Sequence, residues 1–310
     1  MSNRWLMPAI LVWVGIGWGA TQPLGKIATQ SGHGPFGLIF WQLVVCVMVL
    51  GTISLARGRG LVLRRAALRF YIVVAVLGTL VPNATFYVSV SRLPAGIMSI
   101  LISTVPLIAF PLALILRSER FSVRRLAGLV LGLTGVAMIA LPGASLPDRA
   151  MVAFLPLAMV GPFFYALEGT YVARYGMEGM DPVQAMFGAS VAGLLLCLPV
   201  TLAMGQFFWP LPVGRPELAL AASSALHALL YATYVWMAAR AGAVFAAQTS
   251  YVVTGAGVLW AMLLLGERFS PILWLALVIM LFGVALVQPR SPAKRSAGAR
   301  DPNQGLECSA

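Results

Sequence analysis

Glu119-Arg120-Phe121-Ser122 returns as Glu267-Arg268-Phe269-Ser270, 148 residues further along the chain. Apolar segments match one another by chance, but a charged tetrapeptide and a glycine held in one register do not. Further identities at this offset, with no gap, are Arg92 with Arg240, Ala95 with Ala243, and Gly135-Val136-Ala137 with Gly283-Val284-Ala285. We interpret the pattern as an internal duplication, and a repeat of this length constrains the fold more than any single segment does.

The composition indicates an integral membrane protein. The 310 residues are 60% hydrophobic and 10% charged, with a mean hydropathy of +0.91, whereas a soluble chain carries about 25% charged residues. So few charges cannot cover a chain of this size with a water-facing surface. A membrane-spanning helix needs about 20 apolar residues, and about ten such runs follow one another here.

The apolar runs divide into two sets of five. The first run is too long for the central region of a signal peptide and lacks a small-x-small cleavage site, so we expect an uncleaved span. The spacing predicts spans at 1–24, 37–55, 71–91, 95–116, 124–141, 152–173, 182–202, 218–239, 243–265 and 271–287. We expect one five-helix repeat over 8–142, another over 151–288, and a disordered cytoplasmic tail over 289–310.

The distribution of positive charge predicts the orientation. Ten spans put both termini on one side of the membrane, and the side richer in Lys and Arg faces the cytoplasm. The residues on the side away from the N-terminus are Lys26, Arg92, Arg149, Arg215 and Arg268, and the rest of the 21 lie on the N-terminal side. We therefore expect a multi-pass protein of the cell inner membrane with both termini in the cytoplasm.

An odd number of spans in each repeat means that the second repeat enters the membrane from the opposite side. The loop with Arg120 is then cytoplasmic and the loop with Arg268 is external. The second copy has Ile272-Leu273 where the first has Arg124-Arg125, as the charge bias requires. The predicted fold class is all-α, with ten transmembrane helices in two inverted five-helix repeats. Secondary transporters use this construction, with the substrate site near the midplane between the repeats.

Several segments together resemble the EamA family of the drug/metabolite transporter superfamily. Trp18-Gly19-Ala20-Thr21 with Lys26 is similar to the start of an EamA domain, and each repeat ends on the Glu-Arg-Phe turn and a glycine-bearing span. The second domain departs from the pattern at Ala166-Leu167-Glu168-Gly169-Thr170. The resemblance covers nearly all of residues 8–288. It implies a ten-helix carrier of small metabolites, often an exporter of amino acids or related compounds, and it leaves the substrate open.

Two ionisable side chains lie well inside the predicted spans, Glu168 in the sixth and His227 in the eighth. Such residues are costly in a membrane and usually face a cavity or a partner. Glu168 is either a carboxylate that couples transport to protons or contacts a cation, or it has a structural role. In the structural role it would pair with Arg174 or be a neutral acid that is hydrogen-bonded in packing. For His227 the alternatives are a substrate contact and a hydrogen-bonded core histidine.

Polar side chains also line up along several predicted helices, since residues three or four apart share one face. The repeat offset pairs Thr79 with His227 and Asn83 with Tyr231, so both halves place polar groups at equivalent positions. Hydrogen bonds between helices would explain one such stripe, and a shared wet cavity explains the set. The predicted substrate-binding residues are Trp18, Thr21, Thr79, Asn83, Tyr87, Ser103, His227, Tyr231, Tyr234, Gln248 and Tyr251, with Glu168 for proton coupling.

Three further motifs are interpreted as structural. The Glu-Arg-Phe turn lies at a predicted membrane edge, where its charged side chains can cap helix ends and hold two spans together. Gly15-x3-Gly19 and Gly128-x3-Gly132 have the small-residue spacing that lets helices approach closely.

Other classes of function lack their sequence signals. There is no glycine-rich phosphate loop, metal-ligand cluster or nucleophile with a base, so we expect no enzyme and no cofactor or metal. The net charge of +12 is placed between apolar runs, which sets topology and does not indicate nucleic acid. Cys46, Cys197 and Cys308 have no paired spacing and imply no disulfide framework.

These observations predict a secondary active transporter. We expect an exporter of a small metabolite, such as an amino acid or related compound, that works by alternating access. Its partners would be the small-molecule substrate, membrane lipids and protons, and the sequence leaves open whether it is a monomer or a homodimer. The alternative is a non-transporting membrane interaction or lipid-handling protein, whose polar stripes would pack together without a cavity. A channel is the third hypothesis.

Overall fold

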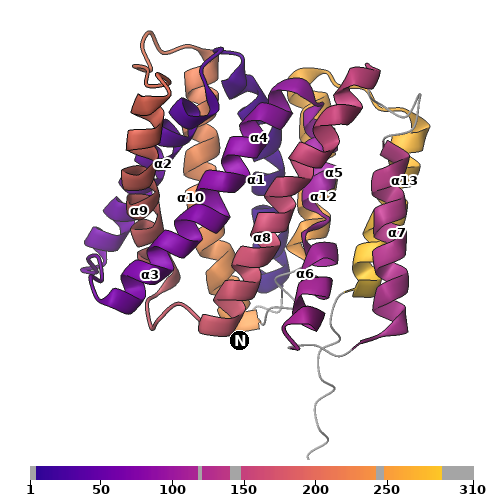
Figure 1. The fold of residues 1–310 in the computed structure, drawn as a ribbon, viewed down its shortest axis with the longest axis horizontal. Coiled ribbons are helices and arrows are strands. Elements are labelled where there is room, and N and C mark those ends of the chain that lie inside the picture. The colour runs from indigo at the N-terminus through magenta and orange to yellow at the C-terminus, as the bar shows by residue number, and fades with distance from the viewer. Residues whose placement is uncertain (1–4, 118–120, 140–147, 242–247, 288–310) are drawn as a thin grey trace, which may run out of the picture.

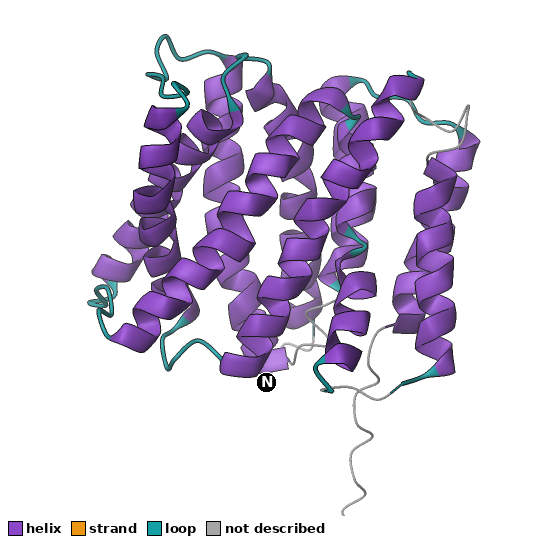
Figure 2. Cartoon of the chain, viewed as in Figure 1, coloured by secondary structure: helices purple, strands orange, loops and turns teal. Residues whose placement is uncertain are grey.

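The computed structural model describes residues 5–117, 121–139, 148–241 and 248–287, and every regular element in these ranges is a helix (Figure 1, Figure 2). In chain order they are α1 (Leu6–Thr29), α2 (Pro35–Ala56), α3 (Arg65–Val74), the π-helix η1 (Ala75–Leu80), α4 (Val81–Arg92), α5 (Ala95–Ile102), α6 (Val105–Ile115), α7 (Val123–Ile139), the 3-10 helix η2 (Arg149–Phe154), α8 (Leu155–Tyr175), α9 (Pro182–Ala203), α10 (Arg215–Ala241), α12 (Thr249–Leu265) and α13 (Pro271–Val287).

Six described segments have the length and composition of membrane spans. Two shorter apolar helices, α12 and α13, accompany the longer ones, and large apolar side chains such as Ile115 and Leu263 are 75% exposed. Apolar surface on this scale suits contact with lipid rather than water. The described segments long and apolar enough to cross a membrane are Pro35–Ala56, Arg65–Arg92, Ala95–Ile115, Ala150–Tyr175, Pro182–Ala203 and Arg215–Met237.

The third predicted span contains a π-helical turn. Within it, η1 separates α3 from α4, and the Val81 N–H bonds to the carbonyl of Val76, five residues back. Pro82 follows directly, and because proline has no N–H, the α-helical ladder cannot include its nitrogen. Turns of this kind are frequent at functional sites. The apolar run predicted the span but not this irregularity.

The fourth predicted span is broken between α5 and α6. The N–H groups of Ser103 and Thr104 bond only three residues back, to Ile100 and Leu101, and their hydroxyl groups donate to the same two carbonyls. Pro106 then stands at the start of α6, where its missing N–H leaves the ladder interrupted. A proline is favourable at the beginning of a helix, so the span continues as a new helix.

Helices from the first half of the chain pack mainly against helices from the second half. α1 contacts α10 and α12, α2 packs against α9, and α7 packs against α13 at one edge of the molecule (Figure 1). α8 in turn packs against α4 and α6. The largest buried apolar cluster also draws residues from both halves, from α4 through α8 and from α12 and α13.

Glycines permit the closest of these helix contacts. A Cβ added at Gly19 would lie 2.7 Å from the backbone nitrogen of Gly257, and one added at Gly128 would lie 2.6 Å from the carbonyl oxygen of Gly283. At Gly15 it would lie 2.5 Å from the Val252 side chain. Larger residues would push α1 away from α12 and α7 away from α13, which confirms the packing interpretation of the small-residue spacings.

The second copy of the repeated turn caps a helix in the other half. Glu267 accepts hydrogen bonds from the backbone N–H groups of Ala95 (2.7 Å) and Gly96 (3.0 Å), at the start of α5. Lys26 Nζ lies 3.8 Å from the same carboxylate and donates to the Leu93 carbonyl oxygen. A carboxylate stabilises a helix N-terminus because it satisfies free N–H groups and opposes the helix dipole. This turn therefore joins α1, α5 and the start of α13.

The first copy of the turn is described only from Phe121 onward. Glu119 and Arg120 lie outside the described residues, so their predicted role at the membrane edge stays a prediction.

Removal of the Glu267 carboxylate should destabilise the protein. We expect Glu267→Ala to lower the free energy of unfolding by about 1–3 kcal/mol, because two N–H groups of α5 lose their partner. Glu267→Gln keeps one acceptor oxygen and should lose less. Thermal unfolding of the purified protein measures both. The control is Glu178→Ala, which removes an exposed ion pair with Arg69 (3.7 Å). Such a pair contributes under about 1 kcal/mol. An equal loss of unfolding free energy at Glu267 and Glu178 contradicts the capping role.

At the opposite end of the molecule, Asp181 caps α9. Its Oδ1 accepts from the N–H groups of Val183 (3.0 Å) and Gln184 (3.3 Å), and the carboxylate pairs with Arg59 (2.7 Å) and Arg57 (3.4 Å). Burial alone would raise the pKa of Asp181, but the Gln184 N–H and the two guanidinium groups hold this pKa below its usual range.

The lowered pKa predicts a pH-dependent stabilisation. The charged form contributes fully above the unfolded pKa of about 3.9 and loses its effect as the pH falls through the lower folded value. We expect Asp181→Asn, which keeps the capping oxygen, to unfold at a lower temperature than wild type at pH 7, with the difference disappearing at strongly acid pH. Asp181→Ala also loses the cap, about 1 kcal/mol, at every pH. A wild-type–Asn difference that is independent of pH contradicts the assignment.

Candidate functional site

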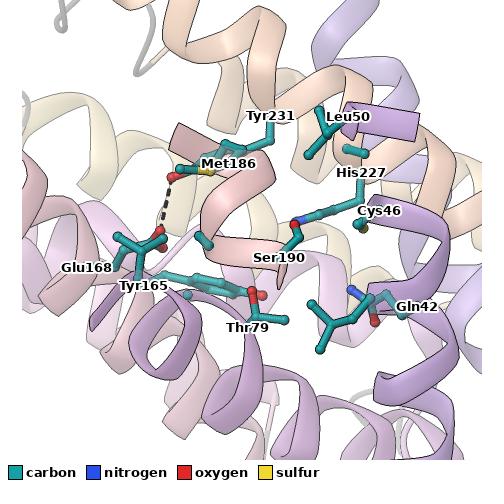
Figure 3. Close-up of a pocket in the computed structure, with 15 residues that line it drawn as sticks. Gln42, Cys46, Leu50, Thr79, Tyr165, Glu168, Met186, Ser190, His227 and Tyr231 are labelled. Atoms are coloured by element: carbon teal, nitrogen blue, oxygen red, sulfur yellow. Dashed lines mark hydrogen bonds between the residues drawn. The ribbon is translucent and has the colours of Figure 1, made fainter. Parts of the chain in front are cut away.

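A small cavity with a polar and an apolar wall lies where α2, η1, α8, α9 and α10 meet (Figure 3). Its volume is about 50 Å³. That space holds a few water molecules, whereas pockets for drug-sized ligands measure about 300–1,000 Å³. This central cavity is therefore much smaller than a pocket of that kind. Its polar wall consists of Gln42, Cys46, Thr79, Tyr165, Glu168, Ser190, His227 and Tyr231.

Equivalent positions of the two halves border this cavity. Thr79 and His227, which the repeat offset pairs, both line it. Gln42 and Ser190, related by the same 148 residues, line it as well. The cavity is therefore built jointly by the two halves of the chain.

Glu168 is the buried carboxyl group of the cavity, with 6% of its surface exposed. The Tyr231 hydroxyl donates to its Oε1 at 3.1 Å. The carboxyl group lies against Gly78 of the π-helix, where an added Cβ would stand 2.5 Å from the carboxyl carbon. Only glycine leaves room there, so η1 and Glu168 fit together as a unit. Arg174, the alternative partner of Glu168, instead lies over the ring of Tyr175 at 5.8 Å.

An aromatic cluster beside the cavity joins α1 to α10. The Trp18 indole N–H donates to Nδ1 of His227 at 3.4 Å, which places the proton of a neutral imidazole on Nε2. The Trp18 ring centroid lies 6.0 Å from that of Tyr231 and 5.4 Å from that of Tyr234. His227 stacks on Tyr231, with centroids 6.0 Å apart. Through Tyr231, this cluster is connected to Glu168.

Three further predicted residues are described by the structure but do not line the cavity. Tyr87 donates from its hydroxyl group to Gln42 Oε1 at 2.8 Å, and so orients an amide of the cavity wall. Thr21 donates to the Trp18 carbonyl oxygen at 2.7 Å. Asn83 is 7% exposed, and its Nδ2 has no hydrogen-bond partner among the described residues. A buried donor of this kind has hydrogen-bonding capacity left for water or a solute.

The structure does not bring Ser103, Gln248 or Tyr251 to the cavity. Ser103 is buried at the α5–α6 break and donates within its own helix. Gln248 is exposed at the start of α12, and Tyr251 packs at the edge of the largest apolar cluster. α12 contacts α1 and α5, and this position separates its polar face from the cavity.

Sequence reasoning missed Gln42, Ser190 and Tyr165. Gln42 is a lone amide in an apolar helix, and Ser190 follows it at the repeat offset, so the duplication itself held the signal. Tyr165 lies three residues before Glu168, which places it on the same face of α8. These three side chains complete the hydrogen-bonding wall of the cavity.

The side chains of the cavity can hydrogen-bond a small polar solute and hold a proton. They supply an amide, hydroxyl groups, an imidazole and one carboxyl group. Within the described ranges, no group of three or more His, Cys, Asp or Glu side chains could hold a metal ion.

The sequence profile of the EamA-like transporter family matches residues 6–141 and again residues 153–288. The chain belongs to this family. Its members are transporters rather than enzymes, and the apolar helices fit a multi-pass membrane protein.

Individual relatives of this EamA-like chain are also transporters. It is 26% identical over 292 residues to the "Probable terminal-alkyne amino-acid exporter" of Streptantibioticus cattleyicolor, covering 92% of this chain and 94% of the relative. It is 27% identical over 280 residues to the "Uncharacterized inner membrane transporter YedA" of Escherichia coli (strain K12), covering 87% and 86%. A solved crystal structure at 17% identity superposes with a TM-score of 0.63 over 89% of this chain and 94% of that one, which shows the shared fold.

The contact between Gly78 and Glu168 predicts a coupling between two substitutions. We expect Gly78→Ala to lower the free energy of unfolding by about 1–3 kcal/mol, because the new methyl group overlaps the carboxyl group. In a Glu168→Ala background, the same change should have little effect, since the space is free. Thermal unfolding of the four variants measures the coupling.

Gly255→Ala is the matched control, because a Cβ there meets nothing within 4 Å and alanine favours a helix over glycine by about 1 kcal/mol. Equal effects of Gly78→Ala in both backgrounds contradict the fit between η1 and Glu168.

Proposed function

We propose that this EamA-like protein is a secondary active transporter that exports a small metabolite, an amino acid or a related compound, across the cytoplasmic membrane by alternating access. The observation that carries the proposal is the polar cavity shared by equivalent positions of the two halves. A site between repeats can be exposed to either side of the membrane when one half moves against the other.

The proposed architecture is ten spans in two inverted five-helix repeats, over 8–142 and 151–288. The pattern of helix contacts supports it. α1, the first helix of one half, contacts α10 and α12, and α8, the equivalent helix of the other half, contacts α4 and the α5–α6 pair. Exchange of the halves thus reproduces the same set of contacts. The bias of Lys and Arg places both termini and the tail in the cytoplasm.

The cavity supports a mostly neutral or zwitterionic solute. Its polar groups are hydrogen-bonding ones, and among the described residues of the wall Glu168 supplies the one carboxyl group. Trp18, Tyr231 and Tyr234 form an aromatic border on one side, which suits an apolar side group. The amino-acid exporter among the relatives agrees with this class of solute. Thr79 and His227 are the proposed polar contacts from the two halves.

Glu168 is the proposed coupling residue. It is a carboxyl group at the cavity wall, within 3.1 Å of a tyrosine hydroxyl, and it can bind and release one proton as the cavity opens to different sides. Tyr231 also belongs to the aromatic border, so a change in the charge of Glu168 alters a hydrogen bond of the solute-binding surface itself.

A ligand screen followed by transport tests the proposal. A compound that binds only the folded protein stabilises it by about 2.7 kcal/mol at a hundredfold excess over Kd, so thermal unfolding against amino acids and their derivatives should identify a ligand. In proteoliposomes, a pH gradient should drive accumulation of that ligand by wild type. Glu168→Gln keeps the size but not the titrating proton, and should retain only downhill exchange.

Glu178→Gln, at a surface ion pair, is the control and should transport as wild type does. A pH-driven accumulation unchanged in Glu168→Gln contradicts the coupling role. Stabilisation by lipids alone, with no solute from the panel, would favour the lipid-handling alternative.

A further inference from the structure

A second and larger cavity, which forms an open groove, lies between η1, α6 and α8. Its volume is about 530 Å³, roughly ten times that of the central cavity, and it is more open to the surroundings. Its walls are apolar, with Leu77, Leu112 and Leu167 among the lining residues, while Thr170 and Arg174 add polar groups. Leu116 and Arg174 place it toward the ends of α6 and α8 that lie on the same side as the N-terminus (Figure 1).

The groove and the central cavity are both lined by η1 and α8. Leu77 lines the groove, and its neighbour Gly78 lines the cavity. Leu167 lines the groove, and its neighbour Glu168 lines the cavity. The contact between Gly78 and the Glu168 carboxyl group therefore forms part of the partition. Figure 3 shows Glu168 from the side of the cavity.

The opposite end of the molecule is held together by direct bonds. The Tyr87 hydroxyl joins α4 to α2 through Gln42 at 2.8 Å, beside the cavity. Further out, Glu267 and Lys26 link α1, α5 and the start of α13. The N-terminal side is bonded too, by Asp181 with Arg57 and Arg59, but these residues do not line the groove. In this conformation, the groove is the wider of the two hollows, and it lies on the N-terminal side.

We propose that the groove is the inner entrance for the solute and that the Gly78–Glu168 contact is the barrier between this entrance and the cavity. The proposal rests on the proposed transport function. It also defines the solute further: Arg174 near the mouth attracts a carboxylate, and the leucines contact an apolar side group. Movement of the Glu168 side chain away from η1 opens the barrier. One carboxyl group thus serves both proton coupling and access.

Cys46 provides a reporter for the route, because it lines the central cavity and its thiol lies 3.6 Å from the Ser224 carbonyl oxygen. With Cys197→Ser and Cys308→Ser, it is the only thiol of the chain. A small charged methanethiosulfonate reagent, added to the cytoplasmic face of inside-out vesicles, should label it slowly. Glu168→Ala should make labelling about tenfold faster, equivalent to about 1.4 kcal/mol on the barrier.

Substitutions that fill the groove should have the opposite effect. We expect Leu112→Trp, or Thr170→Trp if the former does not fold, to slow labelling about tenfold. Leu195→Trp is the matched control, because Leu195 is 67% exposed on the lipid-facing side of α9. In this variant Cys46 should be labelled at the same rate as in the protein without a tryptophan in the groove. Thermal unfolding verifies that each variant is folded.

The outcomes separate this proposal from the transport function. If Cys46 is labelled at equal rates with and without a tryptophan in the groove, as when a lipid occupies the groove, the groove is not the entrance. Labelling only from the external face excludes this entrance as well. If the expected labelling pattern is found but no solute is transported, the route stands and the transport proposal fails.

Discussion

The close approach of helix backbones from opposite halves of the chain is the constraint on which the other features depend. It is possible because glycines meet at the contacts of α1 with α12 and of α7 with α13. In a lipid environment, association between helices relies on such packing and on hydrogen bonds, because apolar burial drives little of it. The two halves therefore do not form separate cores: their largest apolar cluster and their central cavity are both shared.

Two acidic side chains in this apolar setting contact a helix where it is irregular or where it begins. The π-helix η1 offers a glycine to the Glu168 carboxyl group, and the start of α5 receives the Glu267 carboxylate from a distant turn. Glu267 accepts hydrogen bonds from backbone N–H groups of the other half of the chain. Glu168 fits against a glycine of the other half. The same type of side chain thus has a structural role at the membrane edge and a proposed functional role at the centre.

Much of this arrangement could be predicted from the sequence. Apolar length predicted the all-helical class, and the repeat offset predicted that Thr79 and His227 occupy equivalent positions, which the shared cavity agrees with. The π-helix and the break at Ser103 could not be predicted, because each depends on how one proline and its neighbours satisfy the backbone locally. Gln248 and Tyr251 share a helical face, but periodicity does not say which neighbour that face meets; here α12 contacts α1 and α5.

The shared cavity also determines how many sites the chain can have. When a domain that binds a ligand by itself is duplicated, each copy keeps its own pocket and the chain has two sites. Here Thr79 and Gln42 come from one half and His227 and Ser190 from the other, and all four line the central cavity. Under the proposed transport function, the duplicated halves would therefore share one site in the described part of the polypeptide and bind one solute there, whatever the number of chains in the assembly.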